Sequence, residues 1–255
     1  MISFIRQFVR RLGFDVIRYH PPSADPIPSD FDQTITTIIN QVRPFTLTSP
    51  ERLLALYEAV RYIVANKIPG SIVECGVWKG GSMMAVAYTL KQLADFDRHL
   101  YLFDTFEGMP LPSTVDVDIT GASASELLRS HKKADPASAW CYVQLDEVKE
   151  AVESVGYSRD KVHFVKGMVE ETIPDYAPET IALLRLDTDW YESTRHELIH
   201  LFPRISHGGV IIIDDYGHWK GARCAVDEYI RENKIKLLLN RIDYTGRIGV
   251  VLKND

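Results

Sequence analysis

Two stretches decide how this chain folds: IALLRLDTD at residues 181–189 and GGVIIIDDY at residues 208–216. In each stretch a short apolar run is followed at once by acidic residues. A short apolar run bounded by turn signals is typical of a strand buried in a parallel sheet. We therefore expect two central strands that carry their acids to the carboxyl edge of the sheet, where open α/β sheets bind ligands.

The acids at that edge predict a site for a divalent cation. Carboxylates buried near one point must be protonated, paired or bound to metal. We expect Asp187, Asp214 and Asp215 to hold Mg²⁺ (or Mn²⁺), because an all-oxygen ligand set suits these hard cations. Zinc is less favoured, since neither stretch contains histidine or cysteine. Arg185 is expected to pair with a nearby acid and is assigned no chemistry.

Length and composition indicate a globular protein with one large α/β domain and a cap. The chain has 255 residues, 45% hydrophobic and 25% charged, with a net charge of −6. This acidic balance argues against nucleic acid as a partner. The three cysteines lack metal-site spacing, which predicts a reducing, cytoplasmic location without disulfides. No apolar run approaches the ~20 residues of a membrane span.

Residues 1–69 are predicted to form a helical N-terminal cap that serves oligomerisation and covers the substrate as a lid. Apolar residues recur at helical spacing near the start of the chain: Ile5, Phe8, Val9 and Leu12. This stripe predicts a helix that packs on its own domain or on a partner subunit, the latter in a homodimer or a higher even oligomer. A helix on a membrane surface is the alternative, because arginines lie between these residues. Further helices are expected over 32–42 and from Ser49-Pro50 onward.

Residues 70–255 alternate strand and helix signals, which predicts a Rossmann-like α/β domain with helices on both faces of a mostly parallel sheet. Seven strands are expected, at 71–77, 99–106, 162–165, 181–186, 209–213, 235–242 and 247–252. The last two form a hairpin that makes the final strand antiparallel. Helices are expected at 82–93, 141–156, 194–202 and 222–231, the third with a Thr194–Glu197 capping box. Residues 107–138 are expected to be an irregular, mobile insertion over the site.

The stretch VECGVWKGGS at residues 73–82 predicts a strand, a glycine turn and the start of a helix. Its glycine spacing differs from the dinucleotide fingerprint. Glu74 would repel a pyrophosphate and suits a cationic or zwitterionic ligand, while Asp104 is placed to bind a ribose diol. Together they favour S-adenosylmethionine over NAD. The alternatives are a simple tight connection for the turn and a helix cap for Asp104.

Four motifs in order resemble those of the macrocin O-methyltransferase (TylF) family. They are VECGVWKGGS (73–82), LFDTFEGMP (102–110), LRLDTDWYEST (184–194) and GGVIIIDDY (208–216). The resemblance covers roughly residues 45–250 and implies a class I methyltransferase fold, S-adenosylmethionine and Mg²⁺. Members of this family methylate macrolide sugars and related natural products, so we expect a hydroxyl of a sugar or glycosylated natural product as acceptor. The insertion at 111–140 and the N-terminal cap match less well, so the particular substrate does not carry over. The resemblance also implies, by position, a cofactor site formed by Glu74, Cys75, Gly76, Ser82, Asp104, Thr105, Gly167 and Met168.

Methyl transfer needs donor and acceptor aligned, and a hydroxyl bound to a cation loses its proton more readily. The resemblance implies that Asp187, which matches the family's usual base candidate, acts as both ligand and base. Asp189 is the second base candidate, because strand residues two apart face the same side at ~6.6 Å. Its alternative role is to hydrogen-bond the start of the helix at Ser193-Thr194. His218 either accepts the hydroxyl proton or is a loop histidine without a catalytic part.

Other functions remain open on these motifs. A catechol-like acceptor would chelate the cation in the same way, whereas an amine acceptor would not need it. A catalytically silent nucleoside-binding domain is the third alternative.

Overall fold

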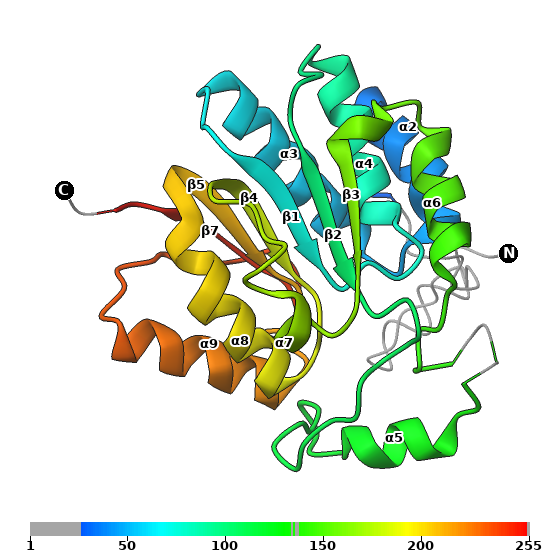
Figure 1. Cartoon of the computed structure of the whole chain (residues 1–255), viewed down its shortest axis with the longest axis vertical. Coiled ribbons are helices and arrows are strands. Elements are labelled where there is room, and N and C mark those ends of the chain that lie inside the picture. Colours follow the sequence, from blue (N-terminus) through cyan, green and yellow to red (C-terminus); the bar gives the residue numbers. More distant parts are fainter. Residues whose placement is uncertain (1–26, 134, 136–137, 254–255) are drawn as a thin grey trace, which may run out of the picture.

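A computed structural model describes residues 27–133, 135 and 138–253, and its centre is a seven-stranded sheet (Figure 1). The strand order is β3-β2-β1-β4-β5-β7-β6. The strands are β1 Ser71–Cys75, β2 Leu100–Asp104, β3 Val162–Lys166, β4 Ile181–Leu186, β5 Ile205–Ile213, β6 Asn240–Arg241 and β7 Arg247–Val251. The first five strands pair in parallel, and β7 runs antiparallel between β5 and β6. The predicted sheet, with its final strand reversed, is confirmed.

The strand order changes direction between β1 and β4, which places a ligand-binding crevice at their carboxyl ends. Glu74 of β1 lies opposite Arg185 of β4, and Arg185 lies opposite Ile212 of β5. Directly paired residues share a face of the sheet. The register therefore gathers Glu74 and Arg185 on one face, just below the ends of the strands.

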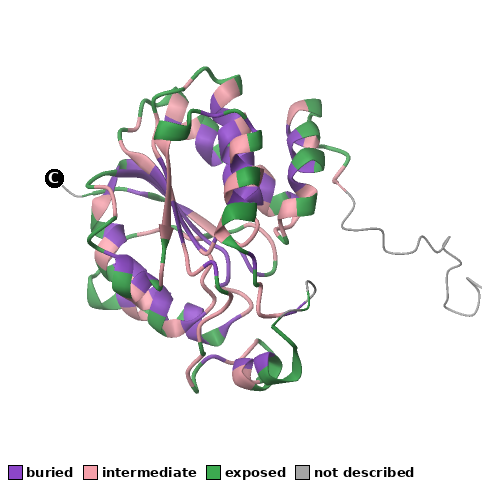
Figure 2. Cartoon of the chain, turned by 45° about the vertical axis from the view of Figure 1, so that its right-hand side comes forward, coloured by how far each residue is buried: buried purple, intermediate pink, exposed green. Residues whose placement is uncertain are grey.

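Helices cover the sheet in two layers (Figures 1 and 2). The helices are α2 Gln33–Val42, α3 Pro50–Ala65, α4 Gly81–Gln92, α5 Ala124–Ser130, α6 Leu145–Ser154, α7 Val169–Thr172, α8 Tyr191–Leu201 and α9 Lys220–Glu232, with short 3-10 turns η1 Arg43–Phe45, η2 Arg159–Lys161 and η3 Phe202–Arg204. One layer, with α2, α3, α4 and α6, shares a hydrophobic core with one face of the sheet. The other layer, with α7, α8 and α9, packs on the opposite face. Figure 2 shows the buried sheet between helices that are buried on their inner sides.

The two helices before β1 begin where the sequence predicts. Asp32 caps α2 by accepting hydrogen bonds from Thr34 N and Ile35 N, and Ser49 caps α3 by accepting one from Arg52 N. Both helices pack into the core shared with the sheet. The domain boundary at residue 69 stays a prediction. The helix expected in residues 1–19 lies outside the described residues.

Three local predictions are wrong: that residues 107–138 are irregular, that a helix begins at 141, and that Thr194 and Glu197 form a capping box. The insertion at 107–138 contains α5 and is not wholly irregular. The helix expected from 141 begins only at Leu145, because Cys141 adopts the left-handed region at φ 48°. The Thr194–Glu197 capping box does not form, because α8 begins at Tyr191 and both residues are buried inside the helix.

The start of α8 is capped instead from the insertion. Asp116, 1% exposed, accepts a hydrogen bond from Tyr191 N at 2.8 Å through Oδ1. Its Oδ2 accepts hydrogen bonds from the backbone N–H and the hydroxyl of Ser113. Lys220 N, at the start of α9, donates to Val117 O at 2.9 Å. The insertion is therefore docked on the amino ends of two helices that follow the acid-bearing strands.

The first hairpin strand is also shorter than predicted, since β6 holds two residues and 235–239 are outside any strand. Leu237 and Leu239 pack against the core without pairing. Within the described part of the chain, no helix combines the length and apolarity needed to cross a bilayer.

Candidate active site

A cavity of about 310 Å³ opens at the carboxyl ends of β1, β2, β4 and β5. It is lined by most of the predicted site residues: Gly76, Ser82, Asp104, Thr105, Gly167, Met168, Asp187, Asp189, Asp214 and Asp215. Glu74 and Cys75 are not among the lining residues. Both are buried in β1, Cys75 within the hydrophobic core and Glu74 against Arg185.

The glycine turn after β1 passes directly against the end of β4. Gly76 has φ +82°, and a Cβ on it would lie 2.0 Å from the carbonyl oxygen of Asp187. Asp187 N in turn donates to Cys75 O at 2.9 Å. Only glycine fits this left-handed turn and close backbone approach. The turn therefore joins the predicted cofactor half to the acid cluster.

Asp104, at the end of β2, holds the backbone of this turn. Its Oδ2 accepts hydrogen bonds from Val77 N at 2.7 Å and Trp78 N at 3.1 Å, and its Oδ1 accepts one from Phe106 N at 2.7 Å. The Thr105 hydroxyl also lies 3.5 Å from Oδ1, so a ribose hydroxyl would have to share or replace one of these contacts. A ribose contact by Asp104 stays a prediction. In the structure Asp104 holds the backbone of the glycine turn in place.

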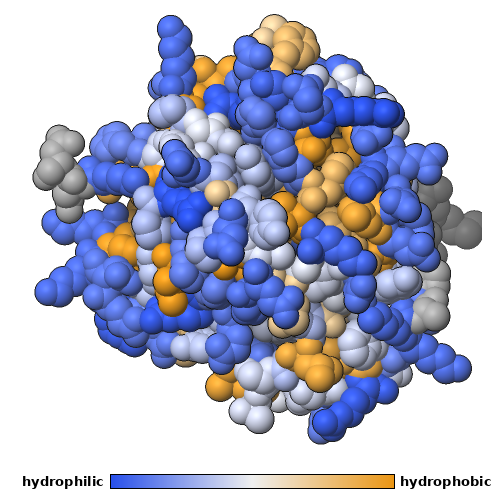
Figure 3. Space-filling view, viewed as in Figure 1, coloured by the Kyte–Doolittle hydropathy of each residue, from blue (hydrophilic) through white to orange (hydrophobic). Residues whose placement is uncertain are grey.

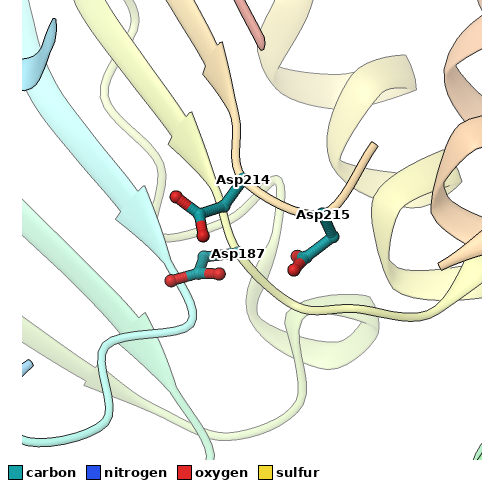
Figure 4. A group of neighbouring side chains, drawn as sticks. All are labelled: Asp187, Asp214 and Asp215. Atoms are coloured by element: carbon teal, nitrogen blue, oxygen red, sulfur yellow. The ribbon is translucent and has the colours of Figure 1, made fainter. Parts of the chain in front are cut away.

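Asp187, Asp214 and Asp215 converge at the floor of the cavity (Figure 4). One carboxylate oxygen from each lies within 4.8 Å of the others. Asp187 follows β4 and its side chain is 27% exposed, whereas Asp214 follows β5 and is nearly fully buried. Two neighbouring strand ends thus place three oxygen donors around one point.

Two arginines also reach this cluster. Arg185 donates hydrogen bonds to Glu74 Oε1 at 2.7 Å, Asp187 Oδ2 at 2.6 Å and Asp214 Oδ1 at 2.6 Å. Arg52, from the first turn of α3, pairs with Asp214. The sequence predicted that Arg185 pairs with a nearby acid, but it did not predict the three-fold contact or the contribution of Arg52.

The acids outnumber these cations. The guanidiniums of Arg52 and Arg185 contact three carboxylates of the site, those of Glu74, Asp187 and Asp214. Two more acids lie beside these, because Asp189 N donates to the carboxylate of Asp215. Burial, and then the neighbouring charges of Asp189 and Asp214, raise the pKa of Asp215. Burial raises the pKa of Glu74 to about 7 against the opposing charge of Arg185.

The donor set suits a divalent cation, which would share Asp214 with the two arginines that bond its two oxygens. The donors are all carboxylate oxygens, which Mg²⁺ and Mn²⁺ favour, and a bound cation would favour their charged forms. Asp187 Oδ1 accepts no hydrogen bond from the described residues, so one oxygen of the cluster remains available for a ligand bond.

Asp189 does not occupy the position predicted from strand geometry. β4 ends at Leu186, and Asp189 adopts φ 66°, so its side chain does not continue the alternation of the strand. Its backbone N–H instead donates to Asp215 Oδ2 at 3.2 Å. Burial, followed by the charge of Asp187, raises the pKa of Asp189 to about 7. The alternative cap at Ser193-Thr194 does not form, because α8 already begins at Tyr191 and Thr194 N donates to Trp190 O inside the helix.

His218 does not line the cavity. Its ring packs edge-on against Trp219 and Tyr244, and its buried Nδ1 has no hydrogen-bond partner among the described residues. This placement favours the interpretation as a loop histidine.

The remaining wall of the cavity is apolar, and sequence reasoning missed most of it. The indole rings of Trp190 and Trp219 pack edge to face, with their centroids 4.9 Å apart. Trp190 Nε1 donates a hydrogen bond to Pro110 O at 3.0 Å. Leu127 and Leu128 of α5 complete this side of the cavity. These residues come from three separated segments, so no local pattern brings them together.

Among solved structures, the fold is similar to that of the O-methyltransferase NovP, with a TM-score of 0.71 and 28% identity, covering 90% of this chain and 92% of that chain. The fold and the site define a class I O-methyltransferase.

The chain belongs to the Macrocin-O-methyltransferase (TylF) family, whose sequence model matches residues 39–249. It is 34% identical over 201 residues to an 8-demethyl-8-(2,3-dimethoxy-alpha-L-rhamnosyl)-tetracenomycin-C 4'-O-methyltransferase of Streptomyces olivaceus, covering 79% of this chain and 73% of the relative. It is 31% identical over the same length to a demethyldecarbamoylnovobiocin O-methyltransferase of Streptomyces niveus, with the same coverage.

Proposed function

We propose that this O-methyltransferase transfers the methyl group of S-adenosylmethionine to a hydroxyl of a sugar carried by a natural product, with Mg²⁺ or Mn²⁺ held by Asp187, Asp214 and Asp215. The observation that carries the proposal is the convergence of three carboxylates within 4.8 Å beside the glycine turn. By their names, one relative methylates a rhamnosyl-substituted tetracenomycin and the other methylates demethyldecarbamoylnovobiocin.

The part of the cavity beside the glycine turn, lined by Gly76, Ser82, Asp104 and Gly167, is the predicted cofactor site and is called the donor half. It suits a ligand without phosphate. The cationic lining residues are Arg52 and Arg185, and carboxylates already engage both. The acids Asp104 and Asp187 lie on the same wall and would repel a phosphate. The positively charged sulfonium of S-adenosylmethionine is compatible with this acidic surrounding.

In the acid half, the bound cation would lower the pKa of the acceptor hydroxyl and fix its orientation. Asp187 is the most exposed of the three ligands, and its Oδ1 accepts no hydrogen bond from the described residues, so this oxygen can accept a proton where it does not bind the ion. We assign the proton-accepting role to Asp187 first and to Asp189 second. The acceptor oxygen would bond the methyl carbon as the carbon–sulfur bond of the donor breaks and S-adenosylhomocysteine leaves, and the hydroxyl proton would move to the carboxylate oxygen.

The acceptor half suits a neutral glycoside. Trp190 and Trp219 offer aromatic surface beside the acids, and sugar rings commonly pack on such surfaces. At the mouth, Leu47 is 71% exposed, Leu127 38% and Met168 39%. Apolar residues that ring a cavity mouth can cover the apolar part of a large acceptor.

The test is transfer of labelled methyl groups to a panel of glycosylated acceptors, with and without Mg²⁺ and with excess chelator. We expect activity that chelator removes and Mg²⁺ restores. Full activity in excess chelator would reject the metal role and would favour an amine acceptor. Binding of S-adenosylmethionine without turnover on any acceptor would favour the nucleoside-binding alternative.

A homodimer and a cytoplasmic location stay predictions. On the face shown in Figure 3, hydrophilic residues predominate and apolar side chains appear in separate groups. Light scattering of the full chain and of a variant lacking residues 1–20 would test the predicted dimer contact.

A further inference from the structure

Arg185 is an unusual residue for its position. It lies within β4, whose residues Ile181–Leu186 are all buried, and it is 3% exposed. A charged side chain in such a place is costly unless every charge is matched by a partner. Its partners are three carboxylates and, at 3.1 Å, the hydroxyl of Thr48.

The guanidinium spans the strand ends that carry the acid cluster. One nitrogen donates to both Glu74 and Asp187, and the other donates to Asp214. Because the guanidinium is planar and rigid, two acids bonded to its two nitrogens are held at a defined spacing. Arg185 therefore links the end of β4 to the end of β5 in a way that a flexible ammonium group does not reproduce.

Glu74 anchors this guanidinium from below. It is the direct register partner of Arg185 across β1 and β4, and it is 1% exposed. It does not line the cavity, so its contact with the site passes through Arg185. Its second oxygen, Oε2, has no hydrogen-bond partner among the described residues.

We propose, resting on the metal role in the proposed function, that Arg185 anchored by Glu74 is a positioning residue for the metal ligands. It holds Asp187 and Asp214 at ligand spacing before the ion binds. It bonds Asp187 through Oδ2 alone, so Oδ1 stays available. Groups behind the ligands of a metal commonly set affinity in this way, and their loss costs about 10–100-fold.

The opposite role has an opposite signature. If Arg185 only competed with the ion for the acids, a lysine in its place would keep the charge, and cation binding would stay unchanged or become tighter. If Arg185 positions the acids, loss of its planar guanidinium lets Asp187 and Asp214 separate or take up protons, and cation binding weakens. The sign of the change in metal affinity therefore distinguishes the two roles, without any measurement of turnover.

The experiment is titration of the full chain with Mn²⁺, followed by the electron paramagnetic resonance signal of the free ion. Arg185→Lys keeps the positive charge but loses the planar guanidinium that bonds two acids at once. We expect its Kd for Mn²⁺ to rise about tenfold or more. Glu74→Gln keeps the shape and loses the anchoring charge, and we expect a smaller rise of roughly threefold. Circular dichroism and calorimetric binding of S-adenosylhomocysteine without metal check that each variant is folded.

Arg98→Lys is the matched control. Arg98 also pairs with an acid, Asp95, and donates to the carbonyls of Ile68 and Gly70, but it lies at the amino end of β2. Its Kd for Mn²⁺ should equal that of the parent protein. An equal loss in Arg98→Lys would assign the effect to general destabilisation and overturn the proposal.

Unchanged or tighter Mn²⁺ binding in Arg185→Lys would overturn the positioning role while leaving the proposed function in place. If Arg185→Lys does not fold, Glu74→Gln decides, and an unchanged Kd there overturns the proposal. If the parent protein binds no Mn²⁺, the metal role itself fails and the positioning role fails with it.

Discussion

The two halves of the cavity are built by different means. The donor half is a backbone structure, in which Gly76 turns where no Cβ fits and Asp104 gathers three backbone N–H groups. The acid half is a side-chain structure, in which two arginines and several carboxylates from β1, β4, β5 and α3 balance one another. The first depends on conformations that neighbouring residues dictate, and the second on charges that only the complete fold brings together.

This difference predicts that substitutions in the two halves affect different properties of the enzyme. Damage to the donor half should act on folding and cofactor affinity, because it displaces backbone. Damage to the acid half should act on metal binding and on the rate of transfer, because the strands that carry the acids stay in place.

The largest effect is expected for Gly76→Ala. The new Cβ would lie 2.0 Å from Asp187 O and 2.6 Å from Asp187 C, which the packed strand ends cannot accommodate. We expect the free energy of unfolding, measured by urea denaturation, to fall by about 4 kcal/mol or more. Gly121→Ala is the control, because Gly121 also has positive φ but its Cβ would meet nothing closer than Lys220 Nζ at 4.0 Å.

Gly121→Ala should cost only the backbone strain of about 1 kcal/mol. Equal losses in the two variants would show that strain, and not the contact with Asp187, requires glycine at position 76.

Asp187→Asn and Asp104→Asn together test the separation of the halves. Asp187→Asn should lower kcat by about 10²–10³-fold, because a carboxylate aimed at the reacting centre is lost. Its Kd for S-adenosylhomocysteine should stay unchanged. Asp104→Asn should raise that Kd about tenfold, since loss of a hydrogen bond to a charged group costs about 1.5–3 kcal/mol.

Calorimetry gives the two Kd values and methyl transfer at saturating cofactor gives kcat. A loss of cofactor binding in Asp187→Asn that matched the loss in Asp104→Asn would contradict the division into halves.

Asp116→Ala tests whether the insertion at 107–138, which supplies part of the cavity wall, is held in place by the helix that follows β4. It removes the cap of α8 and the anchor of residues 113–116, so we expect a loss of about 1–2 kcal/mol in stability. Hydrogen exchange over residues 107–144 should accelerate, and the KM for the acceptor should rise more than the KM for the cofactor. Asp116→Asn keeps one accepting oxygen and should lie between the parent and Asp116→Ala. Unchanged exchange in the insertion would show that other contacts dock it.

The smallest effect is expected for Asp243→Asn, at the turn that supports Arg52. Burial alone would raise the pKa of Asp243, but hydrogen bonds from Gly246 N and Ser49 and the charge of Arg52 outweigh it and lower that pKa. A lowered folded-state pKa stabilises the protein above the unfolded pKa of about 3.9, and this contribution fades as the pH falls through the folded-state pKa. Asp243→Asn should therefore cost about 0.5–1 kcal/mol at pH 7 and progressively less below about pH 4. A constant difference across this range, in urea midpoints, would contradict the charge-based account.

Much of the donor half can be predicted from the sequence. The spacing of glycines after an apolar run predicts the turn at Gly76, and an acid after the next strand predicts Asp104 at the same edge. The same reasoning places Asp187, Asp214 and Asp215 together, because parallel strands must end at one edge. Local patterns also predict the start of α3 at Ser49 and Pro50, which the structure confirms.

Local patterns misplace residues whose conformation depends on distant neighbours. The capping box at Thr194 and Glu197 satisfies every local rule, yet Asp116, far earlier in the chain, caps the helix three residues sooner. Asp189 leaves the strand alternation because β4 ends at Leu186.

The sequence by itself determined the order of strands and helices, the glycine turn and the edge at which the acids gather, because each follows from periodicity and turn chemistry over a few residues. Only the tertiary structure decided which charges meet. Arg185 and Glu74 are 111 residues apart in the chain, and Arg52 and Asp214 are 162 apart. Pairing over such distances is set by sheet register and helix packing, and the strength of each charge contact depends on burial that exists only in the folded state.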